Sequence, residues 1–277
     1  MKTNKELYFA AKKLQNKYLN DSCIKNLLID ANGFDNFSDL IKGFNLECKD
    51  ETKFYGNLDR VLDGEPIQYV LGYTEFLDLK LKVNKNVLIP RQETEELALI
   101  VSKALKDIKE DINIADVCTG SGTLAIKLKK DIPHANVYAS DISEEAINVA
   151  ADNSSINNTS ITFFIGDMLT PFIKLGIKLD VLVANPPYIG DSSTIDEQVY
   201  KYEPHLALLA EPKTKYYEEI FKHVNEVMNP QYLIALEIGE DMQEELTKLM
   251  QKYLKTASFL FKKDIYGRLR FLIIRGE

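Results

Sequence analysis

Apolar residues recur at helical spacing in the first part of the chain, which predicts short helices there. The apolar stripe of the first expected helix consists of Leu7, Ala10, Ala11, Leu14 and Tyr18. A second helix is expected to be capped by Asp21 or Ser22. Another helix is expected over residues 51–63, ending at Gly64 with Pro66 just beyond.

The period of the apolar pattern changes near residue 77. Apolar and polar side chains alternate over residues 77–83, which is typical of strands or a hairpin. We therefore expect a small all-α domain over residues 1–72, a β-hairpin linker over residues 73–88 and a third domain over residues 89–277.

Expected helices and strands alternate through the third domain. The expected helices cover residues 92–109, 123–130, 143–153, 216–228 and 241–253. The expected strands cover residues 112–117, 136–140, 161–165, 179–184, 232–238, 258–262 and 269–274. This order predicts an α/β fold with a mostly parallel seven-stranded sheet and helices on both of its faces. Ligands of such sheets bind at the carboxyl ends of the strands, so the residues there are candidates for a site.

Charge is unevenly distributed along the chain, whose net charge is −8. Residues 1–84 hold 12 Lys and Arg against 13 Asp and Glu, whereas residues 85–277 hold 22 against 29. Nucleic-acid-binding proteins usually carry a basic patch. The acidic balance of the third domain therefore argues against a nucleic-acid substrate without excluding it.

Cysteine usage and apolar content indicate a cytoplasmic protein. Cys23, Cys48 and Cys118 show neither CxxC spacing nor a histidine cluster, which argues against a metal site or a disulfide framework. The first twenty residues contain no long apolar run, and no other stretch approaches the length of a membrane span. We expect no signal peptide, no contact with a membrane and no metal.

A glycine-containing loop links the strand over residues 112–117 to the following helix. The segment Cys118-Thr119-Gly120-Ser121-Gly122 lets the backbone approach a ligand closely, next to the unpaired N–H groups of a helix N-terminus. Its pattern suits either a nicotinamide dinucleotide or S-adenosylmethionine, and a tight turn without a ligand is the plainer alternative.

Two aspartates end the next two expected strands. Asp141 is expected to accept hydrogen bonds from ribose hydroxyl groups, or else to be a carboxylate favoured by a helix N-terminus. Asp167 is expected to accept a hydrogen bond from an adenine amine, with Met168 packed on the ring. Asp167 is equally well explained as a turn residue.

The strand over residues 179–184 ends in a rigid polar corner, Asn185-Pro186-Pro187-Tyr188. Neither proline has an N–H for a sheet ladder, so the strand must end there. An alternative is a plain strand-ending turn, because Asn-Pro is a turn signal.

The corner suits methyl transfer to a planar nitrogen. Such a nitrogen is a poor nucleophile because its lone pair is delocalised. The side-chain oxygen of Asn185 and the carbonyl of Pro186 can accept hydrogen bonds from its two N–H groups, while Tyr188 packs on the planar group. Positioning of this kind contributes up to about 7–11 kcal/mol. Hydride transfer needs no such pair of acceptors, so the corner favours S-adenosylmethionine in the loop.

These motifs together resemble those of Rossmann-like methyltransferases. Further segments resemble one branch, the release factor glutamine methyltransferases (HemK/PrmC family), over about residues 60–277. The matching segments are residues 68–72, 75–76, 89–95, 116–122, 185–188, 203–208, 237–239 and 264–270, with Asp141 and Asp167. The chain departs from the family pattern at Cys118, where Gly is frequent, at Gln92, where Pro is usual, and at Met168, where some members have an aromatic residue. These departures are expected to affect affinity more than activity.

The resemblance implies a reaction and the residues that perform it. Methyl transfer from S-adenosylmethionine to the amide nitrogen of the glutamine in a release factor's Gly-Gly-Gln motif would leave S-adenosylhomocysteine. The residues implied for the cofactor are Cys118, Thr119, Gly120, Ser121, Gly122, Asp141, Asp167, Met168 and Asn185. Those implied for the substrate glutamine are Asn185, Pro186, Pro187 and Tyr188, of which Asn185, Pro186 and Tyr188 would be catalytic.

The resemblance also bears on the partner and on the first domain. It implies that the helices of residues 1–72 help to hold the release factor, and we expect the enzyme to act as a monomer. Arg91 and Glu95 are expected to form a structural salt bridge near the site. The alternatives that stay open are a nucleic-acid exocyclic-amine methyltransferase, a non-catalytic module that binds a translation factor, and a dinucleotide oxidoreductase.

Overall fold

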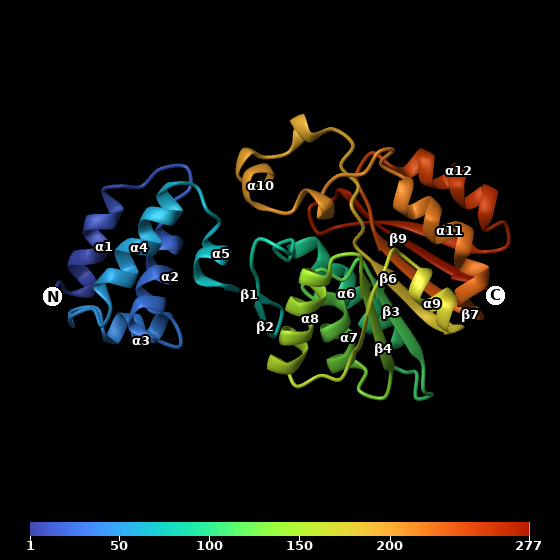
Figure 1. The fold of residues 1–277 in the computed structure, drawn as a ribbon, viewed down its shortest axis with the longest axis horizontal. Coiled ribbons are helices and arrows are strands. Elements are labelled where there is room, and N and C mark those ends of the chain that lie inside the picture. The colour runs from blue at the N-terminus through green and yellow to red at the C-terminus, as the bar shows by residue number, and fades with distance from the viewer. Residues whose placement is uncertain (277) are drawn as a thin grey trace. The chain divides into compact units, whose positions relative to one another are not determined.

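The computed structural model describes residues 1–276, which form two compact units (Figure 1). The helical unit comprises Met1–Tyr73 together with Glu197–Tyr202. The sheet unit comprises Thr74–Asp196 and the chain from Glu203 onward. No helix among the described residues combines the length and the apolar character that a membrane crossing requires.

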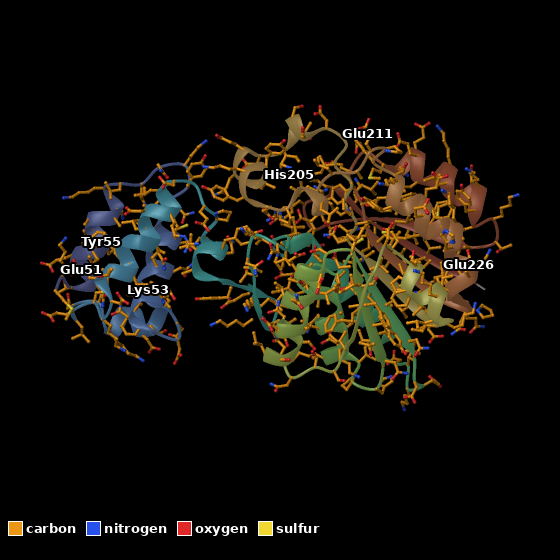
Figure 2. All side chains as sticks on the ribbon, in the orientation of Figure 1. Glu51, Lys53, Tyr55, His205, Glu211 and Glu226 are labelled. Carbon is orange, nitrogen blue, oxygen red and sulfur yellow. The ribbon has the colours of Figure 1, made fainter. Side chains whose placement is uncertain are left out.

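The helical unit is built from short, well-capped helices. Their bounds are Asn4–Lys12 (α1), Asp21–Asn32 (α2), Phe37–Lys42 (α3), Glu51–Leu62 (α4), Ile67–Leu71 (α5) and Glu197–Tyr202 (α10). Leu7, Leu27 and Phe54 are fully buried in its core. Polar contacts of α4 add to this packing: Tyr55 accepts a hydrogen bond from Lys2 Nζ at 2.8 Å, and Lys53 pairs with Asp30 at 2.9 Å. Figure 2 labels Tyr55 and Lys53 on this helix.

The sequence prediction for the first two helices was wrong in two details. Helix α1 ends at Lys12, so the expected stripe does not continue to Tyr18. The side chain of Asn16 accepts hydrogen bonds from the N–H groups of Tyr18 and Leu19, and this local turn competes with a helix. Helix α2 is capped by Asn20, whose side chain accepts from the N–H of Cys23, and not by Asp21 or Ser22.

Helix α10 joins the helical unit although it lies far along the sequence. Glu197 pairs with Lys17 at 2.7 Å, and the side-chain amide of Gln198 donates to the carbonyl of Gly64 at 2.9 Å. Tyr202 donates its hydroxyl to the carbonyl of Asp63 at 3.1 Å. The unit therefore contains a segment that lies outside the residues 1–72 expected from the sequence.

The sheet unit contains the predicted seven-stranded, mostly parallel sheet. Its strands are Asn113–Val117 (β3), Asn136–Asp141 (β4), Thr162–Ile165 (β5), Leu179–Ala184 (β6), Met228–Glu237 (β7), Ser258–Lys263 (β8) and Leu269–Gly276 (β9). Their order is β5-β4-β3-β6-β7-β9-β8, and β9 is antiparallel to both of its neighbours. The strands Tyr73–Phe76 (β1) and Leu79–Lys82 (β2) form a separate two-stranded sheet.

Helices cover both faces of the large sheet (Figure 1). Their bounds are Gln92–Leu105 (α6), Thr123–Asp131 (α7), Glu144–Ile156 (α8), Thr170–Leu175 (α9), Lys215–Val227 (α11) and Gln243–Tyr253 (α12). In β6, Leu182 and Ala184 face the core under α9, α11 and α12, whereas Val181 and Val183 face the core under α6 and α7. Burial on both faces explains why β6 reads as a continuous apolar run.

The carboxyl ends of the central strands meet at one edge of the sheet. Val117 in β3 pairs with Ser140 in β4 and with Ala184 in β6, and Ala184 in turn pairs with Leu236 in β7. The residues that follow these strands therefore converge on one place, as the sequence predicts for a ligand site.

Candidate functional site

A cavity of about 240 Å³ lies at this edge of the sheet unit. The residues singled out from the sequence that line it are Cys118, Thr119, Gly120, Ser121, Asp141, Asp167, Met168, Asn185 and Pro187. Gly122, Pro186 and Tyr188, which were also singled out, are not among the lining residues. The structure thus brings most of the candidate residues together around a single cavity.

The loop between β3 and α7 forms a tight turn under the cavity. Gly120 and Gly122 have φ values of +54° and +83°, in the left-handed region that favours glycine. A Cβ at Gly122 would lie 3.0 Å from the Cβ of Ala150, so this glycine lets α7 and α8 pack closely. Cys118 also has a positive φ, of +60°, which costs a non-glycine residue about 1–2 kcal/mol.

Asp116 is a buried carboxylate directly beneath this loop. Its Oδ2 accepts hydrogen bonds from Thr119 Oγ1 at 2.6 Å and from the N–H of Ala125, in the first turn of α7, at 3.1 Å. Within residues 1–276, its Oδ1 is buried without a hydrogen-bond partner. Burial, followed by the nearby charge of Asp141, raises the pKa of Asp116 to about 7.

Asp141 faces the cavity from the end of β4. Its Oδ2 accepts from the N–H of Gly120 at 2.9 Å and its Oδ1 from the N–H of Ser143 at 3.0 Å. Burial raises the pKa of Asp141, while these N–H groups stabilise its charged form. Each carboxylate oxygen keeps a lone pair for a further donor.

These carboxylates decide which kind of cofactor the loop can hold. Asp116 and Asp141 already occupy the N–H groups of Ala125 and Gly120, which a dinucleotide-binding loop would present to a pyrophosphate. A pyrophosphate would also bring negative charge next to two carboxylates. S-Adenosylmethionine instead carries a sulfonium and an ammonium group, so the acidic cavity fits this cofactor.

Asp167 and Met168 lie at the end of the cavity formed by the segment after β5. The Asp167 side chain is exposed, whereas Met168 is buried and has a φ of +46°. The carbonyl of Met168 accepts a hydrogen bond from Ser140 at 3.3 Å, and its Sδ lies 3.6 Å from Cys118 Sγ. This position suits packing of Met168 against a planar ring, and the roles of both residues stay predictions.

The polar corner begins at Asn185, directly after β6. Asn185 Nδ2 donates to Thr94 Oγ1 at 3.2 Å, and Thr94 donates to the buried carboxylate of Glu237 at 2.7 Å. Among the described residues, none donates a hydrogen bond to Asn185 Oδ1. This oxygen is therefore available as an acceptor at the cavity, which Asn185 and Thr94 both line.

Hydrogen bonds fix Tyr188 and the residue that follows it, Ile189. The hydroxyl of Tyr188 donates to Glu237 Oε1 at 3.4 Å, and burial raises the pKa of Tyr188 well above its usual value. Ile189 donates to the carbonyl of Leu208 at 3.0 Å, and its own carbonyl accepts from Ala210. The corner is thus anchored on two sides, and the substrate contacts predicted for Pro186 and Tyr188 stay predictions.

Arg91 does not pair with Glu95, contrary to the sequence-based expectation. Arg91 instead contacts Glu203 at 2.6 Å, and Glu203 also accepts from the N–H of Ile89 at 3.0 Å. Glu95 accepts a hydrogen bond from the N–H of Leu77. Glu203 is almost fully buried and offers the stronger site for the guanidinium.

Several cavity-lining residues were not predicted from the sequence. They come mainly from the segment before α6, from α6 itself, from the segment before α11 and from α11: Lys85, Asn86, Val87, Leu88, Pro90, Arg91, Thr94, Pro204, Leu206, Ala207 and Tyr216. His205 and Glu211, labelled in Figure 2, mark the last of these segments. The family resemblance covers residues 89–95 and 203–208, and this was the signal that could have located them.

Comparisons with known proteins agree with this geometry. Residues 96–201 match the model of the family described as "Methyltransferase small domain". A "Release factor glutamine methyltransferase" of Staphylococcus aureus is 41% identical over 223 residues, which cover 79% of this chain and 79% of that protein. Another protein of that name, from Bacillus cereus, is 35% identical over 232 residues, which cover 82% of each chain.

The chain belongs to the release factor glutamine methyltransferase family. It is therefore an S-adenosylmethionine-dependent methyltransferase. A solved T. thermophilus 16S rRNA methyltransferase, in complex with AdoMet and guanosine, shares the fold with a TM-score of 0.55 at 13% identity. That likeness covers 74% of this chain and 50% of the other.

Proposed function

We propose that this enzyme methylates the side-chain amide nitrogen of the glutamine in the Gly-Gly-Gln loop of a peptide chain release factor. The observation that carries the proposal is the side-chain oxygen of Asn185, which is held at the cavity by a bond through its own amide nitrogen and accepts no other hydrogen bond among the described residues. A carboxamide nitrogen has two N–H groups to offer to such an acceptor. The curated relatives bear the name of this activity.

The cofactor end of the cavity would be formed by the loop of residues 118–121 and by Asp141, Asp167 and Met168. When bound there, S-adenosylmethionine supplies an electrophilic methyl group on a positively charged sulfur. Asp141 would accept hydrogen bonds from the ribose hydroxyls. Asp116 would contribute negative charge beneath the loop, where its Oδ1 lacks a partner.

The acceptor end would hold the glutamine amide through Asn185 and the rigid segment Pro186-Pro187. Asn185 Oδ1 would accept one amide N–H, which turns the nitrogen lone pair toward the methyl group. Transfer would form an N–C bond as the S–C bond breaks, with the electron pair of the broken bond left on sulfur. The nitrogen would then lose one proton to solvent, so no general base would be needed before transfer.

The exposed apolar residues of the helical unit support a docking role for this unit. Phe9 and Phe37 are each 47% exposed, and Ile41 is 61% exposed. Contiguous exposed apolar patches mark sites of protein–protein contact, and these three residues are candidates for such a patch. We propose that the helical unit binds the body of the release factor, and that the enzyme acts in the cytoplasm, where release factors work.

Incubation with a radiolabelled methyl donor and an intact release factor tests the proposal. We expect label on the release factor, and no label on a variant in which the glutamine of the Gly-Gly-Gln loop is replaced by alanine. Duplex and single-stranded DNA serve as competing substrates in parallel reactions. Label on DNA but not on the release factor would overturn the proposal in favour of an exocyclic-amine methyltransferase.

A further inference from the structure

Glu237, the last residue of β7, is a buried carboxylate that does not line the cavity. Its side chain accepts hydrogen bonds from two residues near the cavity. Thr94 donates to its Oε2 at 2.7 Å and Tyr188 donates to its Oε1 at 3.4 Å. Its main-chain carbonyl accepts from Tyr217 at 2.7 Å. The reaction described above makes no use of this residue.

Glu237 forms no ion pair among the described residues, although the charge of Arg270 acts on it and lowers its pKa. Arg270 pairs instead with Asp264 at 3.6 Å. A buried carboxylate outside an ion pair costs free energy, and a neutral side chain of similar volume would pack at lower cost. Retention of a carboxylate here therefore needs a reason beyond packing.

The direction of the hydrogen bonds supplies that reason. An ionised carboxylate can only accept, so the hydroxyl of Thr94 must donate to Glu237. The oxygen of Thr94 is then left as an acceptor, and only the nitrogen of the Asn185 amide can donate to it. The amide is thereby fixed with its nitrogen toward Thr94 and its oxygen toward the cavity.

We propose that Glu237 is a positioning residue which, through Thr94, holds the Asn185 amide in the one orientation that presents an acceptor to the substrate nitrogen. This inference rests on the proposed function, because it specifies how the site selects an N–H-bearing group. Without the relay, the Asn185 amide is free to turn over. A turned amide presents two N–H groups, which cannot accept from the substrate.

Protonation of Glu237 would reverse the relay. A protonated carboxyl can donate to Thr94, whose hydroxyl can then donate to Asn185 Oδ1 and turn the amide. The groups that face Glu237 are Glu93 and Thr94 of α6, Tyr188 of the corner, Tyr217 of α11 and Arg270 of β9. Burial, followed by the charge of Glu93, raises the pKa of Glu237 to about 7. The ionised, active arrangement is therefore lost as the pH falls through about 7.

Thr94→Val removes the hydroxyl group of the relay, and Glu237→Gln replaces one of the two acceptor oxygens of Glu237 by an N–H donor; both changes keep the side-chain shape. Misplacement of a reacting group costs up to about 100-fold in rate, so we expect kcat for release factor methylation to fall by about 10- to 100-fold in each variant. The dissociation constant of S-adenosylmethionine, measured by calorimetry, should change by less than about threefold, because the relay acts at the acceptor end. Thr94→Ser keeps the hydroxyl and should recover most of the kcat that Thr94→Val loses.

The double variant Thr94→Val with Glu237→Gln gives the decisive comparison. Two members of one relay should show non-additive losses, so the double variant should be about as slow as the slower single variant. Multiplied losses in the double variant would overturn the relay. The pH profile of kcat adds a second readout: the wild type should lose activity as pH falls through about 7, whereas Glu237→Gln should have a flatter profile.

Tyr217→Phe is the matched control. It removes a hydrogen bond to the main-chain oxygen of Glu237 and leaves the carboxylate unchanged. We expect a lower melting temperature with little change in kcat. Wild-type kcat in both Glu237→Gln and Thr94→Val would refute the relay while methylation itself stands. Failure of the wild-type enzyme to label a release factor would refute the proposed function instead. If Glu237→Gln does not fold, Thr94→Val and Thr94→Ser still decide the question.

Discussion

Asp116 closes the N-terminus of α7 from beneath the cofactor loop, with its Oδ2 at 3.1 Å from the backbone nitrogen of Ala125. A carboxylate at a helix N-terminus is favoured by the helix dipole. This one is also fully buried, and its second oxygen has no hydrogen-bond partner within residues 1–276. The loop therefore carries its own acidic group, which supports the proposed site for a cationic cofactor and lowers the stability of the protein when it is ionised.

Asp116→Asn should stabilise the enzyme at alkaline pH. The pKa of Asp116 is raised from 3.8 to about 7 in the folded protein, so the folded state binds more protons than the unfolded state between these values. The contribution of protonated Asp116 to the free energy of unfolding is complete below about pH 4 and is lost as the pH rises through about 7. At pH 8 the variant should gain at most about 4 kcal/mol in free energy of unfolding, at 1.36 kcal/mol per pKa unit.

Urea denaturation of both proteins at pH 5 and pH 8 checks this expectation. The gain of Asp116→Asn over the wild type should be larger at pH 8 than at pH 5. Cofactor affinity should fall at the same time, because the negative charge beneath the loop is lost. If the difference in free energy of unfolding between Asp116→Asn and the wild type were smaller at pH 8 than at pH 5, the raised pKa of Asp116 would be contradicted.

Asp141→Ala should weaken binding of S-adenosylmethionine by about 1.5–3 kcal/mol, the contribution of a hydrogen bond to a charged group. The same change frees the N–H groups of Gly120 and Ser143, so part of the loss reflects a looser loop. Asp141→Asn keeps an acceptor and should lose less affinity than Asp141→Ala. Calorimetry on both variants measures the difference, and unchanged affinity in Asp141→Ala would reject the ribose assignment.

Asn185→Ala should abolish methyl transfer while cofactor binding stays mostly intact, because Asn185 is assigned mainly to the acceptor amide. The measurement is kcat for release factor methylation together with the dissociation constant of the cofactor. Asn229→Ala provides a control, since Asn229 contacts Asp180 at 2.7 Å near the start of β7. Full activity in Asn185→Ala would remove the proposed role of the corner.

Deletion of residues 1–72 should spare cofactor binding and reduce methylation of an intact release factor. The reason is that the proposed docking surface lies on the helical unit, whereas the cavity lies wholly within the sheet unit. A short Gly-Gly-Gln peptide should be methylated equally well by the full chain and by the truncated chain. Equal turnover of the intact release factor by both would show that the helices do not dock it.

The parts of the fold that depend on local pattern were readable from the sequence. Strand β6, Leu179–Ala184, has the predicted bounds because its apolar run is buried on both faces and stops at two prolines. Helix α8 starts as predicted, because the side chain of Ser143 accepts from the N–H of Ala146. Short elements were missed: α9 and α10 have six residues each, too few for a helical period to emerge.

The parts of the site that depend on distant pairs were not readable. Thr94 and Glu237 are 143 positions apart, and Arg91 and Glu203 are 112 apart. A nearby charge such as Glu95 is the natural partner for Arg91 when only the sequence is known. The fold brings Glu203 to Arg91 instead, because the chain returns to the edge of the sheet after β6. Pattern reasoning therefore located the loop and the corner but not the groups that orient them.

The sixth helix of the helical unit, α10, begins 126 positions after the fifth helix, α5, has ended at Leu71. As the chain leaves the ribosome, the contacts that Lys17, Asp63 and Gly64 make with α10 have to wait until Tyr202 has emerged. By that time most strands of the large sheet have been synthesised. The helical unit is therefore not encoded by one continuous segment. If N-terminal segments were exchanged between relatives, only part of the unit would be exchanged. The native contacts with α10 would be kept only if residues 197–202 were exchanged as well.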